Sequence, residues 1–378
     1  MKAQQHAPAQ LAAEAGLRAA EANLSTANSR PNPTLTYENE NVLGSGRYAG
    51  FGGGERTLSL SVPIELGGKR KARRTVAEAD RAVAGLGIAV TRADITQRAT
   101  EAFVEAVAAE RRLAVVQEAN ELAGRAAHAA RERVRVGKAS PIEEQRADVV
   151  RVRAEVTLTK AVRGLALARA NLARLTGSSS DVSTVAGWFD VMEPPRVQRT
   201  DATPSVLAAE AQVAAAGARV AAARSDRIPD LTVTAGVRRY GDVSDKAAVL
   251  GISVPLPLFN TGTAALARSR AEYDRALAER DVAAQEAARA QAQAEAEVAD
   301  ALSMARAATG PALAAAREAA RIARIGYAEG KFPQLELLDA ERALAETQEA
   351  AVDALAAFYL AQARLGRLYG STNPIYKD

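Results

Sequence analysis

The feature that most constrains this chain is an internal duplication. The run SVPIEL at residues 61–66 returns as SVPLPL at 253–258, and Gly137-Lys138 returns as Gly330-Lys331. The second member of each pair lies 192 or 193 positions after the first. An offset that stays nearly constant along the chain indicates a duplicated structural unit. We therefore predict a first repeat over residues 1–177, a connector over 178–200, a second repeat over 201–370 and a C-terminal tail over 371–378.

The predicted elements follow the same order in both repeats. Apolar and polar residues alternate strictly in Arg56–Val62, which is the period of a β-strand. Apolar residues recur every seven positions from Leu337 to Leu365, which is the period of a coiled coil. The first strand is expected to run to Val42, and Gly310-Pro311 is expected to interrupt a long helix. Each repeat should contain a helix (about 8–28 and 204–225), a β-hairpin (33–65 and 230–258) and a long helical hairpin (68–176 and 262–369).

The composition excludes several classes of active site. The chain has no cysteine, which excludes disulfides and thiolate zinc sites, and its two histidines offer almost nothing for a histidine-based metal site or a catalytic triad. Its 49 basic and 45 acidic residues leave a net charge of +4, which is too small to indicate nucleic-acid binding. We therefore predict no catalytic residues, no cofactor, no resident metal and no nucleic-acid partner.

The predicted strands and helices pose an assembly problem. Four strands cannot close a barrel, and unpaired strand edges must find partners. Three chains would supply twelve strands, each about 9–11 residues long and able to cross a bilayer when tilted. The long helices span on the order of 100 Å at 1.5 Å per residue, which is too long for a globule, and would form a tube below the barrel.

Several motifs, taken in order, resemble a known family. They are NPTL at residues 32–35, the Val-Pro-(Ile/Leu)-x-Leu end of each second strand, the two glycine-containing helix reversals, LDAER at 338–342 and ARLGRL at 363–368. Together they resemble the outer membrane factors, the TolC-like family of Gram-negative efflux systems, over nearly the whole chain. The run LGGKR at 66–70 is most similar to the CzcC-like branch, which exports heavy-metal cations.

This resemblance implies a mainly α fold with a small β part, in which a unit of helix, β-hairpin and long α-hairpin is duplicated. It implies a homotrimer with a twelve-stranded outer membrane β-barrel, in contact with outer membrane lipid, and a long α-helical periplasmic barrel. It implies no enzymatic activity. The chain would be the passive export duct of a tripartite system, with a periplasmic membrane fusion adaptor and an inner membrane RND pump as partners. The implied cargo is divalent heavy-metal cations.

Two other functions stay open on the sequence alone. The same fold would serve as an efflux duct for drugs and other organic compounds. A soluble coiled-coil scaffold from a truncated gene would also explain the heptads. The segment Met1–Pro8 lacks the apolar core of a signal peptide. Because the implied location is the outer membrane with a periplasmic extension, we expect either a truncated N-terminus or a misassigned start codon.

The two helix reversals are the predicted contacts with the adaptor. A glycine after one helix and a proline before the next predict that the helix stops and restarts. An ordinary helix–helix turn without a partner is the alternative. Family members often carry arginine where this chain has Phe332, so a salt-bridge lock is not expected there. The turns consist of Gly137, Lys138, Ala139, Ser140 and Pro141 in the first repeat and of Gly330, Lys331, Phe332 and Pro333 in the second.

Three acidic residues just after the turns are candidate lumen or gate residues. Glu336 and Asp339 match positions where acidic residues ring the narrow tunnel end in the family, and Glu143 is their counterpart in the first repeat. Rings of carboxylates favour cations and form an electrostatic gate. The alternative is that all three are ordinary solvated charges on a helix face.

A run of basic residues, Lys69–Arg74, follows the second predicted strand of the first repeat. Its composition resembles a nucleic-acid-binding patch. Its place at the predicted membrane boundary makes lipid headgroups an equally natural partner, and a solvated helix start is the alternative.

Overall fold

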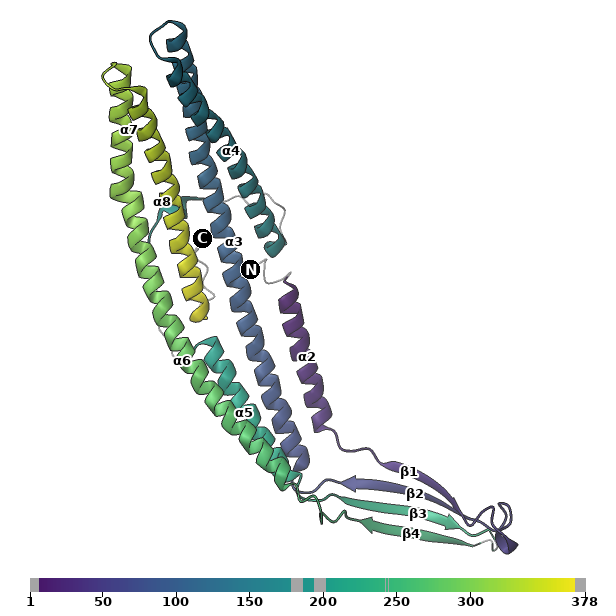
Figure 1. Ribbon diagram of the computed structural model, residues 1–378. Helices are drawn as coiled ribbons and strands as arrows, with labels where there is room; N and C mark the ends of the chain where they lie inside the picture. Colours follow the sequence, from purple (N-terminus) through teal and green to yellow (C-terminus); the bar gives the residue numbers. More distant parts are fainter. Residues whose placement is uncertain (1–6, 178–185, 194–201, 242, 244, 371–378) are drawn as a thin grey trace. The chain divides into compact units, whose positions relative to one another are not determined.

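The computed structural model describes residues 7–177, 186–193, 202–241, 243 and 245–370 (Figure 1). The chain is mainly helical, with one small β-sheet. The first half contains α2 (Pro8–Asn28), β1 (Thr34–Glu40), the short 3₁₀ helix η1 (Gly46–Tyr48), β2 (Glu55–Ile64), α3 (Lys69–Arg135) and α4 (Pro141–Thr176). After the 3₁₀ helix η2 (Ala186–Asp190), the second half contains α5 (Pro204–Ser225), β3 (Leu231–Arg239), β4 (Lys246–Ser253), α6 (Thr263–Ala307), the π-helical turn η3 (Ala308–Ala312), α7 (Leu313–Ala328) and α8 (Gln334–Leu368). The predicted order of elements is therefore present in both halves.

The chain forms two compact units that differ from the sequence repeats. The helical unit comprises residues 1–12, 88–204 and 285–378, and the sheet unit comprises residues 13–87 and 205–284. Each unit combines segments of both halves, and α3 and α6 run through both units. The repeat boundaries at 177, 200 and 370 stay a prediction. The tail over 371–378 lies outside the described residues.

The sheet unit contains a four-stranded antiparallel sheet in the order β1-β2-β3-β4. The two predicted hairpins form one sheet because β2 pairs with β3. This pairing runs from Arg56 opposite Arg239 to Ile64 opposite Leu231. β2 and β3, with 10 and 9 residues, have the predicted length of about 9–11, whereas β1 and β4, with 7 and 8 residues, are shorter. The expected end of the first strand at Val42 is wrong: β1 stops at Glu40, because Asn41 has a φ of 56° and breaks the extended backbone.

The core of the helical unit is built around aromatic residues. Phe358 of α8 is fully buried, and Phe189 of η2 is 1% exposed. Trp188 stacks on Phe103 and meets the ring of Tyr359 edge-on, with centroids 5.7 and 4.7 Å apart. The Tyr359 hydroxyl donates to the backbone carbonyls of Trp188 and Val191 at 2.8 and 2.5 Å, and burial raises its pKa to about 12. These contacts therefore anchor η2, which lies in the described part of the predicted connector, in the core of the helical unit.

The heptad positions predicted from the sequence face the interior of the helical unit. Leu344, Ala351, Phe358 and Leu365 are buried on α8, and Leu337 is half-buried. Leu165 and Leu172, which lie seven residues apart on α4, are buried as well. The clusters around them include many alanines, such as Ala108 and Ala305, which are fully buried. Small side chains of this kind let helices approach closely, which suits the alanine-rich composition.

The predicted interruption at Gly310-Pro311 is confirmed. These two residues lie in η3, a π-helical turn between α6 and α7. Proline lacks a backbone N–H donor and cannot continue the regular hydrogen-bond ladder, so the helix widens locally. The single glycines Gly85, Gly87 and Gly124 lie in α3, which continues through them without a break.

Among the described helices, α5 is the one long and apolar enough to cross a membrane by length and composition alone. Most of its apolar residues are alanines. Ala215, Ala216 and Ala218 are buried, and Arg219 pairs with Asp80 of α3 at 2.6 Å. These contacts place α5 in the packing of the sheet unit.

Candidate functional site: the helical hairpin tips

Both helix reversals use the same backbone motif at the tips of the helical hairpins. At the first, the Gly137 N–H donates to the Val134 carbonyl at 3.0 Å, and the Lys138 N–H donates to the Arg133 carbonyl at 2.8 Å. At the second, the Gly330 and Lys331 N–H groups donate to the Tyr327 and Gly326 carbonyls at 3.0 and 2.8 Å. This is the Schellman helix ending, which needs a left-handed residue in its glycine position. Gly137 and Gly330 have φ values of 69° and 73°.

The helices restart by different means after the two turns. Ser140 caps α4, its hydroxyl accepting from the Ile142 N–H at 3.4 Å, and Pro141 occupies the first turn. Pro333 occupies the N-cap position of α8 without a side-chain hydrogen bond. Glu143 and Glu336 lie in the first turns of α4 and α8, where a negative charge interacts favourably with the helix dipole.

Phe332 is folded back onto its own hairpin. A Cβ atom added to Gly326 would lie 2.2 Å from the Phe332 ring, so the ring packs against the helix backbone where no side chain intervenes. Phe332 is half-buried. The ring fastens the turn to α7 by contact rather than by charge.

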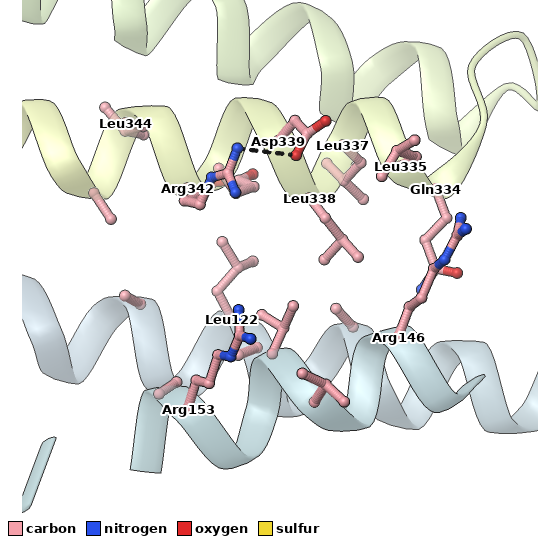
Figure 2. A pocket seen from close by; sticks show the side chains of 18 of the residues that line it. Leu122, Arg146, Arg153, Gln334, Leu335, Leu337, Leu338, Asp339, Arg342 and Leu344 are labelled. Carbon is pink, nitrogen blue, oxygen red and sulfur yellow. Dashed lines mark ion pairs between the residues drawn. The ribbon is translucent and has the colours of Figure 1, made fainter. Parts of the chain in front are cut away.

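A groove of about 920 Å³ lies between the α3–α4 hairpin and the α7–α8 hairpin, all within the helical unit (Figure 2). Its apolar lining includes Leu122 of α3 and Leu338 of α8, which point toward each other across the opening (Figure 2). Arg146 reaches from α4 toward Gln334 at the start of α8 (Figure 2). The charged side chains along the groove are Arg133, Arg146, Arg153, Arg324 and Arg342, with Glu118, Glu143, Asp339, Glu341 and Glu349.

The structure separates the three predicted acids. Glu143 and Asp339 both line the groove, and Asp339 pairs with Arg342 at 3.3 Å. Glu336 is exposed and is not among the residues that line the groove. Their role in a lumen stays a prediction, as does the contact of the nine turn residues with an adaptor.

Sequence reasoning missed the ion pair that ties α7 to α8. Arg324 donates to both carboxylate oxygens of Glu341, with one distance of 2.7 Å, and the Glu341 side chain is only 8% exposed. The hydrogen bond to Glu341 raises the pKa of Arg324, and the negative charges of Glu341 and Glu118 raise it further. Partial burial lowers the pKa but does not outweigh these effects. Glu341 belongs to the LDAER motif, but a partner 17 positions earlier on another helix follows no periodic rule.

Two further contacts link the hairpins on either side of the groove. The guanidinium of Arg133 lies 5.2 Å from the ring centre of Tyr327, a cation–π contact between the ends of α3 and α7. Arg112 of α3 donates to Asp353 of α8 at 2.7 Å. Nearby, burial and the charge of Asp353 raise the pKa of Glu349. The groove therefore has ionic or aromatic links at both ends.

Three of the five cations in the basic run Lys69–Arg74 pair with carboxylates inside the sheet unit. Lys69 pairs with Asp230 at 2.9 Å and Arg74 with Glu78 at 2.8 Å. Arg73 pairs with Glu65, and Arg70 donates to the backbone and side chain of Asn28. These contacts favour neither nucleic acid nor lipid headgroups as its partner. Among the described residues, no group of three or more His, Asp or Glu side chains is arranged to hold a metal ion.

Comparison with known proteins gives a consistent family. The outer membrane efflux protein family matches residues 1–178 and 199–371. The cobalt-zinc-cadmium resistance protein CzcC of Cupriavidus metallidurans is 31% identical over 369 residues, covering 95% of this chain and 86% of that protein. The nickel and cobalt resistance protein CnrC of the same organism is 32% identical over 291 residues, covering 74% of this chain and 69% of that protein.

Solved structures share the fold at lower sequence identity. The outer membrane protein VceC of Vibrio cholerae superposes with a TM-score of 0.80 at 22% identity, covering 98% of this chain and 94% of that chain. At this identity the likeness supports the fold alone.

We predict that Gly326→Ala destabilises the second tip by about 1–3 kcal/mol, because the new methyl group must displace the Phe332 ring. Relative to Phe332→Ala alone, the double variant should lose little further stability, because the clash between the new methyl group and the ring is gone. Hydrogen exchange at the Lys331 and Phe332 amides and thermal unfolding would measure both effects. Gly164→Ala, at an uncrowded position within α4, is the matched control and should be neutral or stabilising. An equal cost of Gly326→Ala in the wild-type and in the Phe332→Ala background would contradict the packing argument.

We also predict that the Arg324–Glu341 pair responds asymmetrically to mutation. Arg324→Gln should cost roughly 3 kcal/mol or more, because it leaves a buried carboxylate unpaired. Glu341→Gln should cost clearly less, because Arg324 is 48% exposed and stays hydrated. Arg321→Gln breaks an exposed pair with Glu318 and should cost at most about 1 kcal/mol. Denaturant unfolding of the purified protein ranks the three, and a larger loss for Glu341→Gln would refute this account.

Proposed function

This chain belongs to the outer membrane efflux protein family, and from that premise we propose that it forms the outer membrane duct of a tripartite heavy-metal efflux system. Three chains would close a twelve-stranded barrel and a helical barrel below it. The duct would be passive, and the energy for export would come from the inner membrane pump.

One observation carries this proposal: the sheet has one apolar and one polar face, and the apolar face is exposed. The strand register places Tyr37, Leu58 and Val237 side by side in one row across the sheet. The next row on the same side contains Leu35, Leu60 and Leu250. Leu250 is 81% exposed and Ile252 is 75% exposed. A water-soluble protein rarely exposes an apolar face of this extent, whereas hydrocarbon chains would cover it in a membrane barrel.

The opposite face suits a water-filled lumen. On β1, β2 and β3 it carries mostly threonine, serine and charged residues at the alternating positions. On β4 it carries the small or apolar residues Ala247, Val249 and Gly251 and then Ser253. The hydroxyls of Ser61 and Thr234 lie 2.9 Å apart across β2 and β3. Arg238 pairs with Glu40 and Glu55, each at 3.0 Å. Alternation of this kind is the signature of a transmembrane β-strand.

The outer strands β1 and β4 supply the argument for a trimer. Each is paired on one side only within the described sheet. A free strand edge is not tolerated in hydrocarbon, because its N–H and C=O groups would lose their hydrogen bonds. Pairing of β4 of one copy with β1 of the next would satisfy both edges. The same pairing would place three identical four-stranded sheets around one axis.

The tips are the proposed contact with the periplasmic adaptor. A trimer would present six tips, and all would share the Schellman ending with glycine followed by lysine. We propose contacts through Gly137, Lys138, Ala139, Ser140 and Pro141 and through Gly330, Lys331, Phe332 and Pro333. Rings of Glu143, Glu336 and Asp339 would line the narrow end of the lumen and favour cations.

The names of the relatives support divalent metal cations as cargo, since one confers resistance to cobalt, zinc and cadmium and the other to nickel and cobalt. A duct receives what its pump delivers, so the choice among these metals would lie with the pump. The soluble scaffold alternative leaves the exposed apolar face unexplained.

The two-faced sheet predicts opposite outcomes for adjacent substitutions on β4. Ile252 lies on the apolar face and Ser253 on the polar face, and both are exposed. Ile252→Lys should cost about 2–4 kcal/mol in the membrane and strongly reduce trimers in the outer membrane fraction. Ser253→Lys should assemble nearly as the wild type does. Membrane fractionation and the size of the detergent-extracted protein measure this, and equal behaviour of the two variants would argue against the barrel.

Deletion of the gene from its own locus should sensitise cells to zinc, cobalt, cadmium or nickel. Complementation by the wild type should restore growth, whereas Ile252→Lys should not. Growth at graded metal concentrations, with common drugs as a parallel series, is the measurement. Sensitivity to drugs alone would replace the metal cargo by organic compounds and keep the duct.

A further inference from the structure

A row of three cations crosses the sheet at the end that carries the strand-connecting loops. Arg56 of β2 is directly opposite Arg239 of β3, and Arg239 is directly opposite Lys246 of β4. All three side chains are exposed. Neighbouring strands lie about 4.8 Å apart, so the three Cα atoms fit within roughly 10 Å. We call Arg56, Arg239 and Lys246 the basic row.

The basic row shares a face with the apolar rows of the sheet. It lies two residues along each strand from Leu58, Val237 and Ala248, which form the first apolar row. Two residues correspond to about 6.7 Å along a strand. Over two residues along each strand, this face therefore changes from apolar side chains, which favour hydrocarbon, to basic side chains, which favour anions.

The charge of the basic row is not compensated within the described part of the chain. Glu40 and Glu55, on the neighbouring strand positions, alternate to the other face, where both pair with Arg238. Asp245 directly precedes Lys246 but takes part in none of the ion pairs among the described residues. None of the ion pairs among the described residues involves Arg56, Arg239 or Lys246. Like charges placed directly opposite on neighbouring strands destabilise a sheet, so this arrangement favours binding of an anion.

The other end of the sheet is built differently. There Lys69 pairs with Asp230 at 2.9 Å, and Arg73 pairs with Glu65. The chain thus supplies its own carboxylates where the strands meet the helices and supplies none on the apolar face at the loop end. This contrast indicates that the basic row is satisfied from outside the protein.

We propose that the basic row binds the phosphate groups of the phosphorylated glycolipid in the outer leaflet of the outer membrane. The inference rests on the proposed barrel, in which the helices lie on the periplasmic side and the loops on the outer side. Guanidinium and ammonium groups match phosphate oxygens in charge and hydrogen bonding. In a trimer the barrel would carry three such rows at the outer headgroup level.

The alternative is that the three side chains extend past the apolar band into water without a specific partner. Long basic side chains do this at membrane interfaces. In that case removal of their charge would leave lipid binding unchanged. The two cases differ in whether phosphate on the lipid matters, which a binding experiment resolves.

The test uses the full-length protein extracted from outer membranes as a trimer, titrated with purified lipopolysaccharide of the shortest sugar type and read by native mass spectrometry. The variant R56Q/R239Q/K246Q should bind this lipid roughly a hundredfold more weakly, since each Lys or Arg near an anionic surface contributes about fivefold. Enzymatically dephosphorylated lipid should bind the wild type and the variant alike. Arg239→Glu should also weaken lipid binding. The introduced carboxylate would lie between Arg56 and Lys246 and offset their charges, so the trimer should still assemble.

The matched control K160Q/R163Q/R289Q removes three exposed cations from α4 and α6 and should bind lipid as the wild type does. Equal lipid binding by the wild type and R56Q/R239Q/K246Q would overturn the inference. If the wild type itself forms no trimer in the outer membrane, the proposed function fails. If it forms one without phosphate-dependent lipid binding, only the inference about the basic row fails.

Discussion

The pairing of β2 with β3 is the interaction on which the sheet depends. It joins strands from opposite halves of the chain, from Arg56 opposite Arg239 to Ile64 opposite Leu231. Because side chains alternate along a strand, a shift of one residue in this register would turn every apolar residue of one hairpin to the polar face. The observed register instead aligns apolar with apolar across all four strands. It thereby converts two marginal hairpins into one sheet with an apolar face and a more polar face.

Much of the helical architecture was predictable from the sequence because its signals are local. The turn glycines Gly137 and Gly330 require positive φ, and the prolines that follow them restart the helices. Helices predicted over about 8–28 and 204–225 have those ends in the structure, and the first helical hairpin ends at Thr176 as predicted. The end of β1 was not predictable, because nothing in the residue type of Asn41 demands a φ of 56° at this position.

The parts that sequence could not supply depend on contacts between distant segments. The pair Arg324–Glu341 and the ring of Phe332 against Gly326 follow from how α7 and α8 pack. Phe189 lies in the segment predicted to be a connector, yet its side chain is only 1% exposed and belongs to the core. Sequence marked Glu143, Glu336 and Asp339 as similar acids, yet their surroundings differ. The basic row likewise exists only once the register of three strands is known.

These differences bear on how an acidic tip would act on a cation in transit. Asp339 interacts with Arg342 at 3.3 Å, so part of its field is cancelled by a neighbouring positive charge. Glu336 is exposed, and no ion pair among the described residues involves it. An uncancelled carboxylate attracts a divalent cation more strongly than a paired one, but exposure to water weakens that attraction and keeps release fast. We therefore propose that, if the lumen of the duct is acidic at this end, Glu336 attracts the cation more strongly than Asp339, whose charge is partly offset by Arg342.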